Sequence, residues 1–152
     1  MTGTTGTPAF RQPSAIERLF NRIFGFLVGM GWGFKHHYVL EVRGRKSGKL
    51  YSNPIDLLQF NGKRYLVAPR GRTQWVRNAE AAAEVALKKG SWRQSFRLKP
   101  IADADKPPLL KAYLENFKSE VQRYFPVQAG SDVQTFVGIA KDYPVFELIA
   151  AA

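Results

Sequence analysis

The dipeptide Asn61-Gly62 restricts the fold more than any other short stretch of this sequence. It stands between two strand-like runs, residues 50–60 and residues 63–68 (KRYLVA). Asn-Gly is a preferred pair for a two-residue turn in which both central residues need positive φ, and such a turn joins antiparallel strands. The sequence therefore predicts an antiparallel β-hairpin near the middle of the chain.

Further strand-like runs lie on both sides of this hairpin. They cover residues 38–43, 84–89, 92–101 and 144–149. Pro54 lies inside the run at residues 50–60, and proline cannot donate a hydrogen bond to a neighbouring strand, so this run should be an edge strand or carry a bulge. Combined with the helical segments below, the order predicts an α+β fold: a small antiparallel barrel-like sheet partly covered by helices.

Two helices are expected after the hairpin. Thr73 is a suitable N-cap for a short helix that runs to about residue 83. Asp105 precedes a pair of prolines suited to a first helical turn, which predicts a longer helix over residues 105–124. Residues 126–136 should then form an irregular loop before the last strand.

The N-terminal part combines a flexible segment with an amphipathic one. Residues 1–12 are rich in Gly and Thr and should be flexible, while residues 13–30 start with a capping box and continue with apolar residues at helical spacing. This helix could pack on the core, or its residues 14–28 could contact a membrane surface. We favour core packing because most amphipathic helices cover their own protein's core, so residues 13–152 should form one domain.

Charge and composition limit the kinds of partner. The 152 residues include 23 Lys and Arg against 12 Asp and Glu, a net charge of +11, so the partner should be nucleic acid, acidic lipid or a phosphorylated small molecule. The chain has no cysteine, which excludes disulfides and thiolate metal sites. Its apolar stretches are too short to span a bilayer and no secretory pattern is present, so we expect a cytoplasmic protein.

Two glycine-containing basic loops are the clearest candidates for an anion site. The first, residues 43–49 (RGRKSGK), is by its local sequence alone explained slightly better as a solvated turn with incidental charge. The second, residues 70–72 (RGR), directly precedes the helix that begins near Thr73, and a helix N-terminus flanked by arginines attracts anions. If the strands at 38–43 and 63–68 are near neighbours in the sheet, both loops would converge on one ligand.

Other residue patterns are weaker. His36 and His37 are adjacent, so in a strand their side chains point to opposite faces and cannot bind one metal together; no metal site is predicted. Ser47 and Ser52 lack a plausible His/Asp partnership, which argues against a serine hydrolase. Trp75 is more readily explained as a packing residue than as a cover for a cofactor.

The ordered set of motifs resembles the deazaflavin-dependent nitroreductase family. The set comprises GRKSG after a strand, a second strand with an internal proline, the run NGKRYLVAPRG and a helix with Trp-x-x-Asn, together covering residues 38–101. That family includes quinone reductases and uses the deazaflavin coenzyme F-420. The resemblance implies an antiparallel split β-barrel, related to flavin-binding oxidoreductase barrels, with flanking helices.

The resemblance also implies roles for individual residues. Arg45, Lys46 and Ser47 would hold the phosphate and oligoglutamate tail of the coenzyme, and Ser52, Asn53 and Pro54 would lie along it. Ala68, Pro69 and Arg70 would border the deazaflavin ring, with Trp75, Arg77 and Asn78 closing the phosphate side. Family members place tyrosines near the ring before the last strand, and Tyr124 is the candidate here for a catalytic hydrogen-bond donor.

Two classes of function follow. The first is an oxidoreductase that transfers a hydride from reduced F-420, or alternatively uses FMN, to a small electrophile such as a quinone, enone or nitroaromatic compound. The second is a non-catalytic small basic barrel that binds a cofactor, lipid or haem, or single-stranded nucleic acid. We favour the first and expect no nucleic-acid partner, because the cations cluster in two glycine loops rather than along a groove.

Overall fold

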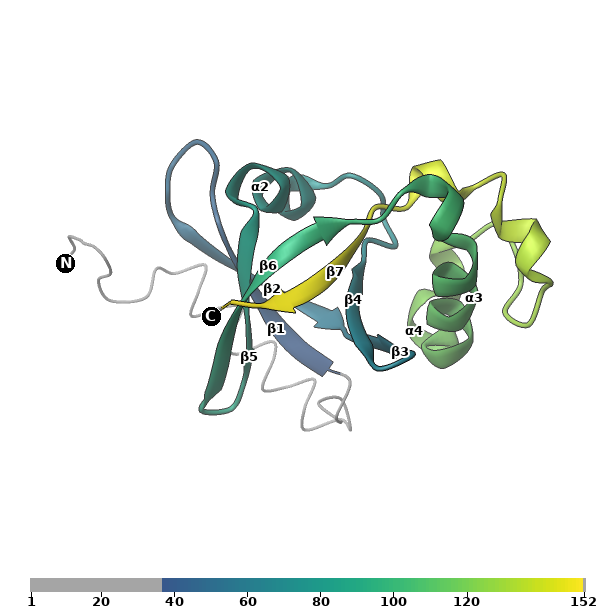
Figure 1. The fold of residues 1–152 in the computed structure, drawn as a ribbon, viewed down its shortest axis with the longest axis horizontal. Helices are drawn as coiled ribbons and strands as arrows, with labels where there is room; N and C mark the ends of the chain where they lie inside the picture. The colour runs from purple at the N-terminus through teal and green to yellow at the C-terminus, as the bar shows by residue number, and fades with distance from the viewer. Residues whose placement is uncertain (1–36, 152) are drawn as a thin grey trace. The chain divides into compact units, whose positions relative to one another are not determined.

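A computed structural model describes residues 37–151 of the chain (Figure 1). The predicted flexible segment at residues 1–12 and the amphipathic helix at residues 13–30 lie outside these residues, and so does any membrane contact through residues 14–28. Among the described residues, no helix has the length and apolar character needed to cross a membrane.

Within residues 37–151, seven antiparallel strands form one sheet. They are β1 (His37–Arg43), β2 (Leu50–Asp56), β3 (Leu58–Phe60), β4 (Lys63–Val67), β5 (Glu84–Lys89), β6 (Trp92–Pro100) and β7 (Val145–Ala150). Their order across the sheet is β2-β1-β5-β6-β7-β4-β3, so β7 lies between β6 and β4 although it is the last strand in the chain.

The two edge strands, β2 and β3, are consecutive in the chain and only Leu57 separates them. A sheet whose opposite edges are joined by one residue has to curl until those edges come close together. The fold is therefore the predicted antiparallel split barrel. The predicted continuous strand over residues 50–60 is wrong in one respect: it divides at Leu57 and contributes an edge strand to each side of the sheet.

The local turn and edge predictions are confirmed. Asn61 and Gly62 both have positive φ, 51° and 77°, and they join β3 to β4 as an antiparallel hairpin. Pro54 lies on the edge strand β2, opposite Val39 of β1. An edge strand has a neighbour on one side only, so the missing N–H of proline can be tolerated there.

Apolar side chains are buried in two main clusters. The first lies on one face of the curled sheet and includes Leu40, Leu87 and Phe96, all fully buried. The second lies between the sheet and the C-terminal helical segment, where Tyr113 and Phe136 pack with residues of β3, β4 and β7. In Figure 1 this helical segment stands beside the β3–β4 end of the sheet. Burial of these side chains is the main force that holds the two layers together.

The described helices are short. They are α2 (Gln74–Ala82), α3 (Pro107–Asn116) and the single-turn α4 (Lys118–Val121), with 3₁₀ turns η1 (Asp103–Asp105), η2 (Gln122–Tyr124), η3 (Val133–Phe136) and η4 (Ala140–Asp142). The predicted loop at residues 126–136 thus contains one 3₁₀ turn, and η3 inserts the ring of Phe136 into the second cluster.

The predicted helix over residues 105–124 is interrupted. Its N-cap is Lys106 rather than Asp105, and the buried Lys106 ammonium donates to the Ala140 carbonyl at 3.1 Å. The helix breaks at Phe117, whose φ of −123° is not helical, directly after Asn116, a weak helix former. This break allows α4 to start in a new direction.

Candidate functional site

Both basic loops lie at the same end of the sheet. Neighbouring strands are antiparallel throughout, so β1 and β4, four places apart in the strand order, run in the same direction. The loops that follow them, residues 44–49 and residues 68–73, therefore leave the sheet at one end, together with α2 (Figure 1). The condition that the two strands are near neighbours in the sheet is not met, because β5, β6 and β7 lie between them.

The first loop docks on α2 through one buried side chain. Asn78 of α2 is only 7% exposed, and its Oδ1 accepts hydrogen bonds from the Arg45 backbone N–H at 3.0 Å and from the Arg45 guanidinium at 2.7 Å. The structure thus brings together two residues that the sequence assigned to one site. A guanidinium has five N–H groups, so this contact leaves Arg45 able to donate to a further acceptor.

The first loop is an ordered turn rather than a loose one. Ser47 Oγ accepts from the Lys49 N–H at 3.1 Å, and the Arg43 guanidinium donates to the Gly48 carbonyl at 2.7 Å. At Gly44, a Cβ would lie 2.6 Å from the Tyr51 ring, so only glycine fits there without displacing that ring. The loop therefore presents Arg45, Lys46 and Ser47 to solvent in a defined arrangement.

The N-terminus of α2 carries an unsatisfied hydroxyl beside cations. Thr73 occupies the predicted N-cap position, but its side chain makes no capping hydrogen bond, and Oγ1 is buried without a partner among the described residues. Arg70 and Arg77 are exposed nearby in the chain, whereas Arg72 forms an ion pair with Glu80 at 2.7 Å. A hydroxyl, a helix N-terminus and two arginines are groups that suit an anionic ligand.

Anchoring of the first loop by Asn78 can be tested by unfolding. In Asn78→Ala, two hydrogen bonds to Arg45 are lost, one of them charge-assisted, so the free energy of unfolding should fall by about 1–3 kcal/mol. Urea denaturation followed by circular dichroism measures this change. Gln74→Ala on the exposed start of the same helix should change it by less than about 0.5 kcal/mol. Equal effects of the two substitutions would show that the contact does not anchor the loop.

The residues predicted to lie along the cofactor do not share one surface. Directly paired residues point to the same face of a sheet, and Asn53 pairs with the core residue Leu40. Ser52 and Pro54 alternate with Asn53, so they point to the other face. At most one or two of these three side chains can therefore line the same ligand.

Residues that follow β4 are mostly buried or half-buried against the core. Ala68 is buried and its N–H donates to the Pro144 carbonyl at 2.9 Å. Trp75 is half-buried and packs against the core, as expected for a packing residue, and Pro69 is half-buried. The predicted contacts of Pro69 and Trp75 with a cofactor could be made only through the parts of their side chains that remain exposed.

Tyr124, the predicted catalytic residue, lies in η2 and packs against the second apolar cluster. The Tyr143 hydroxyl donates to the Tyr124 carbonyl at 2.6 Å, and the Arg123 guanidinium carbon lies 4.9 Å from the Tyr124 ring centroid. These contacts belong to the C-terminal helical segment rather than to the basic loops, so the catalytic role of Tyr124 stays a prediction.

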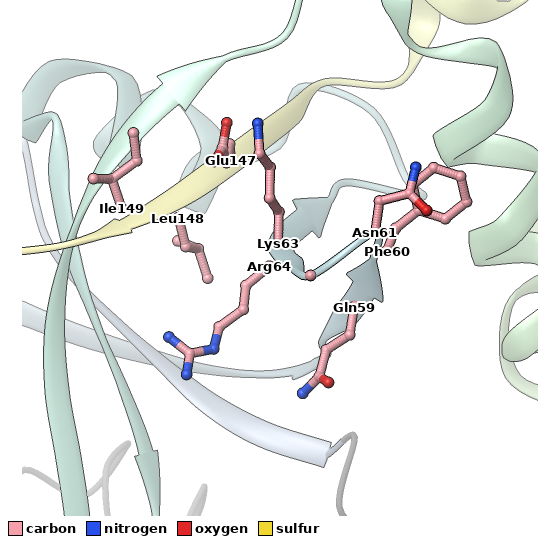
Figure 2. Close-up of a pocket in the computed structure, with 9 residues that line it drawn as sticks. Gln59, Phe60, Asn61, Lys63, Arg64, Glu147, Leu148 and Ile149 are labelled. Atoms are coloured by element: carbon pink, nitrogen blue, oxygen red, sulfur yellow. The ribbon is translucent and has the colours of Figure 1, made fainter.

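An open pocket of about 570 Å³ lies at the β3–β4 hairpin, where β4 pairs with β7. Figure 2 shows the Lys63 and Glu147 side chains extending to one side of the sheet and the Arg64 and Gln59 side chains to the other. The hairpin is at the opposite end of β4 from residues 68–70. This pocket is therefore separate from the basic loops.

The structure also assembles a cluster that the sequence did not predict. His37 Nε2 lies 3.1 Å from Asp56 Oδ1 and 3.2 Å from both carboxylate oxygens of Glu120. Burial, together with the nearby Glu120 carboxylate, raises the pKa of Asp56 to about 8. His37 and Asp56 pair directly across β1 and β2, which a correct strand register would have revealed, but Glu120 is 83 residues from His37 in the chain.

Comparisons with solved structures support the fold. A protein of unknown function from Agrobacterium tumefaciens is 17% identical with a TM-score of 0.53; the match covers 77% of this chain but only 50% of that protein, so this chain spans half its length. An F-420-H2 dependent reductase is 20% identical with a TM-score of 0.50, over 75% of this chain and 94% of the other. A haem storage protein from Vibrio cholerae is 9% identical with a TM-score of 0.51, over 87% and 89%. Identities this low show the fold alone.

The sequence itself identifies the family. No curated protein matches it significantly. A model of the F-420H(2)-dependent quinone reductase family, however, matches residues 16–138, which is most of the chain. The protein therefore belongs to the F-420H(2)-dependent quinone reductase family and is an oxidoreductase whose cofactor is the deazaflavin F-420.

Proposed function

We propose that this protein transfers a hydride from reduced F-420 to a small electrophilic acceptor: a quinone, an enone or a nitroaromatic compound. Membership of the family supports reduction that depends on F-420, and the class of acceptor is the part that we add. The observation that most supports the proposal for this chain is the docking of the first basic loop on α2 through Arg45 and Asn78. It attaches the first loop to the helix that carries Arg77, at one end of the barrel.

The residues at this end fit the anionic tail of the coenzyme. Lys46 and the remaining N–H groups of Arg45 can donate charge-assisted hydrogen bonds to carboxylate or phosphate oxygens. Thr73 Oγ1 is buried without a partner among the described residues, so an anion oxygen beside α2 would satisfy it. Arg77, one turn into α2, adds positive charge where the helix dipole is also positive.

Hydride transfer then needs few groups from the protein. The bound coenzyme supplies the hydride, and the protein positions the ring and stabilises negative charge that develops on the acceptor. In this proposal the ring lies beside Ala68–Arg70, where the chain leaves β4. Tyr124 is the proposed hydrogen-bond donor to the acceptor.

Cofactor binding by the purified protein tests the proposed tail site. Fluorescence titration with F-420 should show saturable binding, and Kd should increase several-fold when salt rises from about 50 to 500 mM, because salt screens the ionic tail contacts. FMN lacks the oligoglutamate tail, so it should bind at least about tenfold more weakly. Equal affinity for both coenzymes, or salt-independent binding of F-420, would contradict a tail-binding role of the basic loops.

A further inference from the structure

Three metal-binding side chains converge at the end of the sheet opposite the basic loops. His37 opens β1 and Asp56 closes β2, directly across from each other, and Glu120 reaches them from α4. One ligand atom from each of the three residues lies within 4.8 Å of the others. We propose that His37, Asp56 and Glu120 form a binding site for a divalent transition-metal ion of the Zn²⁺ class.

The distances between the donor atoms suit a shared ion. Zn²⁺ binds nitrogen and oxygen at about 2.0–2.2 Å, so two ligands of a tetrahedral ion stand roughly 3.3 Å apart. His37 Nε2 lies 3.1 Å from Asp56 and 3.2 Å from Glu120. The distances from His37 to the two carboxylates are thus within a few tenths of an ångström of the spacing that one ion requires, and all three ligand atoms lie within 4.8 Å of one another.

The donor atoms of the cluster converge on one another from three elements of the fold. His37 Nε2 carries at most one hydrogen, yet three carboxylate oxygens lie within 3.2 Å of it. A dication attracts imidazole nitrogen and carboxylate oxygen from all of these directions at once. The ion would also offset the repulsion between two carboxylates that are close together and partly buried.

The donor set and its burial indicate the class of ion. An imidazole with two carboxylates favours Zn²⁺ and related transition metals over Mg²⁺ or Ca²⁺, which prefer oxygen ligands alone. The His37 side chain is 3% exposed and that of Asp56 is 9% exposed, but the Glu120 side chain is 31% exposed and leaves a route for the ion. Three protein ligands leave a coordination position for water.

Binding at this place would affect stability. The three ligands come from β1, β2 and α4, so the ion would tie the barrel to the C-terminal helical segment. A ligand that binds only the folded state raises the melting temperature. At a zinc concentration about 100 times Kd, Tm should rise by roughly 5–10 °C for a domain of this size.

Full-length protein, stripped with a chelator and then dialysed free of it, is titrated with ZnCl₂ by isothermal calorimetry. We expect one Zn²⁺ per chain, a higher Tm with zinc, and reversal of that shift by EDTA. Co²⁺ replaces Zn²⁺ as a spectroscopic probe and should give visible absorption bands of a nitrogen- and oxygen-ligated ion. Absence of stoichiometric zinc binding to folded wild-type protein would overturn the proposal.

Substitution of the proposed ligands tests whether zinc binds at this cluster. Glu120→Gln and His37→Gln should each weaken zinc binding by at least about 100-fold, because loss of a direct ligand costs more than loss of a residue that only orients one. His36→Gln, at the only other histidine of the chain, should leave Kd unchanged. If His37→Gln does not fold, Glu120→Gln decides alone, since this partly exposed residue is least needed for folding. Wild-type affinity in Glu120→Gln, or lost binding in His36→Gln, would overturn the site.

F-420 titration of the same variants separates this inference from the proposed function. The cluster lies at the other end of the barrel from Arg45 and Asn78, so Glu120→Gln should bind F-420 with wild-type affinity. Loss of zinc binding with retained F-420 binding is the expected result. Parallel loss of both in Glu120→Gln would show that the cluster maintains the fold rather than a separate metal site, and would overturn the proposal.

Discussion

The double variant Arg45→Ala/Lys46→Ala is expected to bind F-420 roughly 10²–10⁴-fold more weakly than the wild-type protein. Each charge-assisted hydrogen bond contributes roughly 1.5–3 kcal/mol, and two such losses correspond to this change in Kd if they add. Arg45 is held by Asn78 before the ligand arrives, so little of its contribution is lost to ordering. Fluorescence titration at low salt measures the effect.

A second double variant controls for net charge. Lys63→Ala/Lys118→Ala also removes two positive charges, but from exposed positions on the β3–β4 hairpin and α4, at the other end of the sheet. It should change the F-420 Kd by less than about threefold, because charges that far away are largely screened. If both double variants weaken binding equally, the protein attracts the coenzyme by its overall charge and the first loop is only a solvated turn.

The variant Tyr124→Phe is expected to slow reduction of the acceptor by roughly ten- to a thousandfold. Its phenol is the proposed donor to negative charge developing on the acceptor, and phenylalanine keeps the packing of the ring but removes that hydrogen bond. Stopped-flow mixing of the reduced F-420 complex with menadione measures the single-turnover rate, and affinity for F-420 should not change.

Tyr38→Phe is the matched control for this experiment. Tyr38 packs edge-on against Trp92, with ring centroids 5.8 Å apart, in another part of the barrel. Loss of its hydroxyl should leave the rate within about twofold of wild type. A wild-type rate in Tyr124→Phe would remove Tyr124 from the mechanism and leave family and cofactor unaffected. A wild-type protein that binds F-420 but reduces no acceptor would contradict the proposed reaction.

Local sequence rules predicted the parts of the fold that local forces determine. Asn61-Gly62 predicted the hairpin because these residues readily adopt the positive φ that the turn needs. Pro54 predicted an edge strand because its missing N–H would be costly in a central one. Interruption of the 105–124 helix at Phe117 and division of the 50–60 run at Leu57 depend on packing against distant segments, which no local rule contains.

The same distinction applies to the site. The two basic loops, with Arg45 and Arg70, were predicted because glycine-hinged cations and a helix N-terminus are visible in short stretches of sequence, whereas the role of Asn78 was implied only by the family resemblance. The condition set for convergence of the two loops is not met, since β1 and β4 are not neighbours; the first loop instead contacts α2 through Arg45 and Asn78. Glu120 could not be connected to His37 without knowing where α4 lies.

The position of β7 determines when this protein can complete its fold during synthesis. A ribosome releases β1 to β6 first, yet β6 and β4 each need the strand at Val145–Ala150 as a partner. Until those residues leave the exit tunnel, the nascent chain carries two sheet fragments with unpaired inner edges, which are prone to pair with other chains. Barrel closure therefore waits for β7, relies on long-range pairing and is slow for that reason.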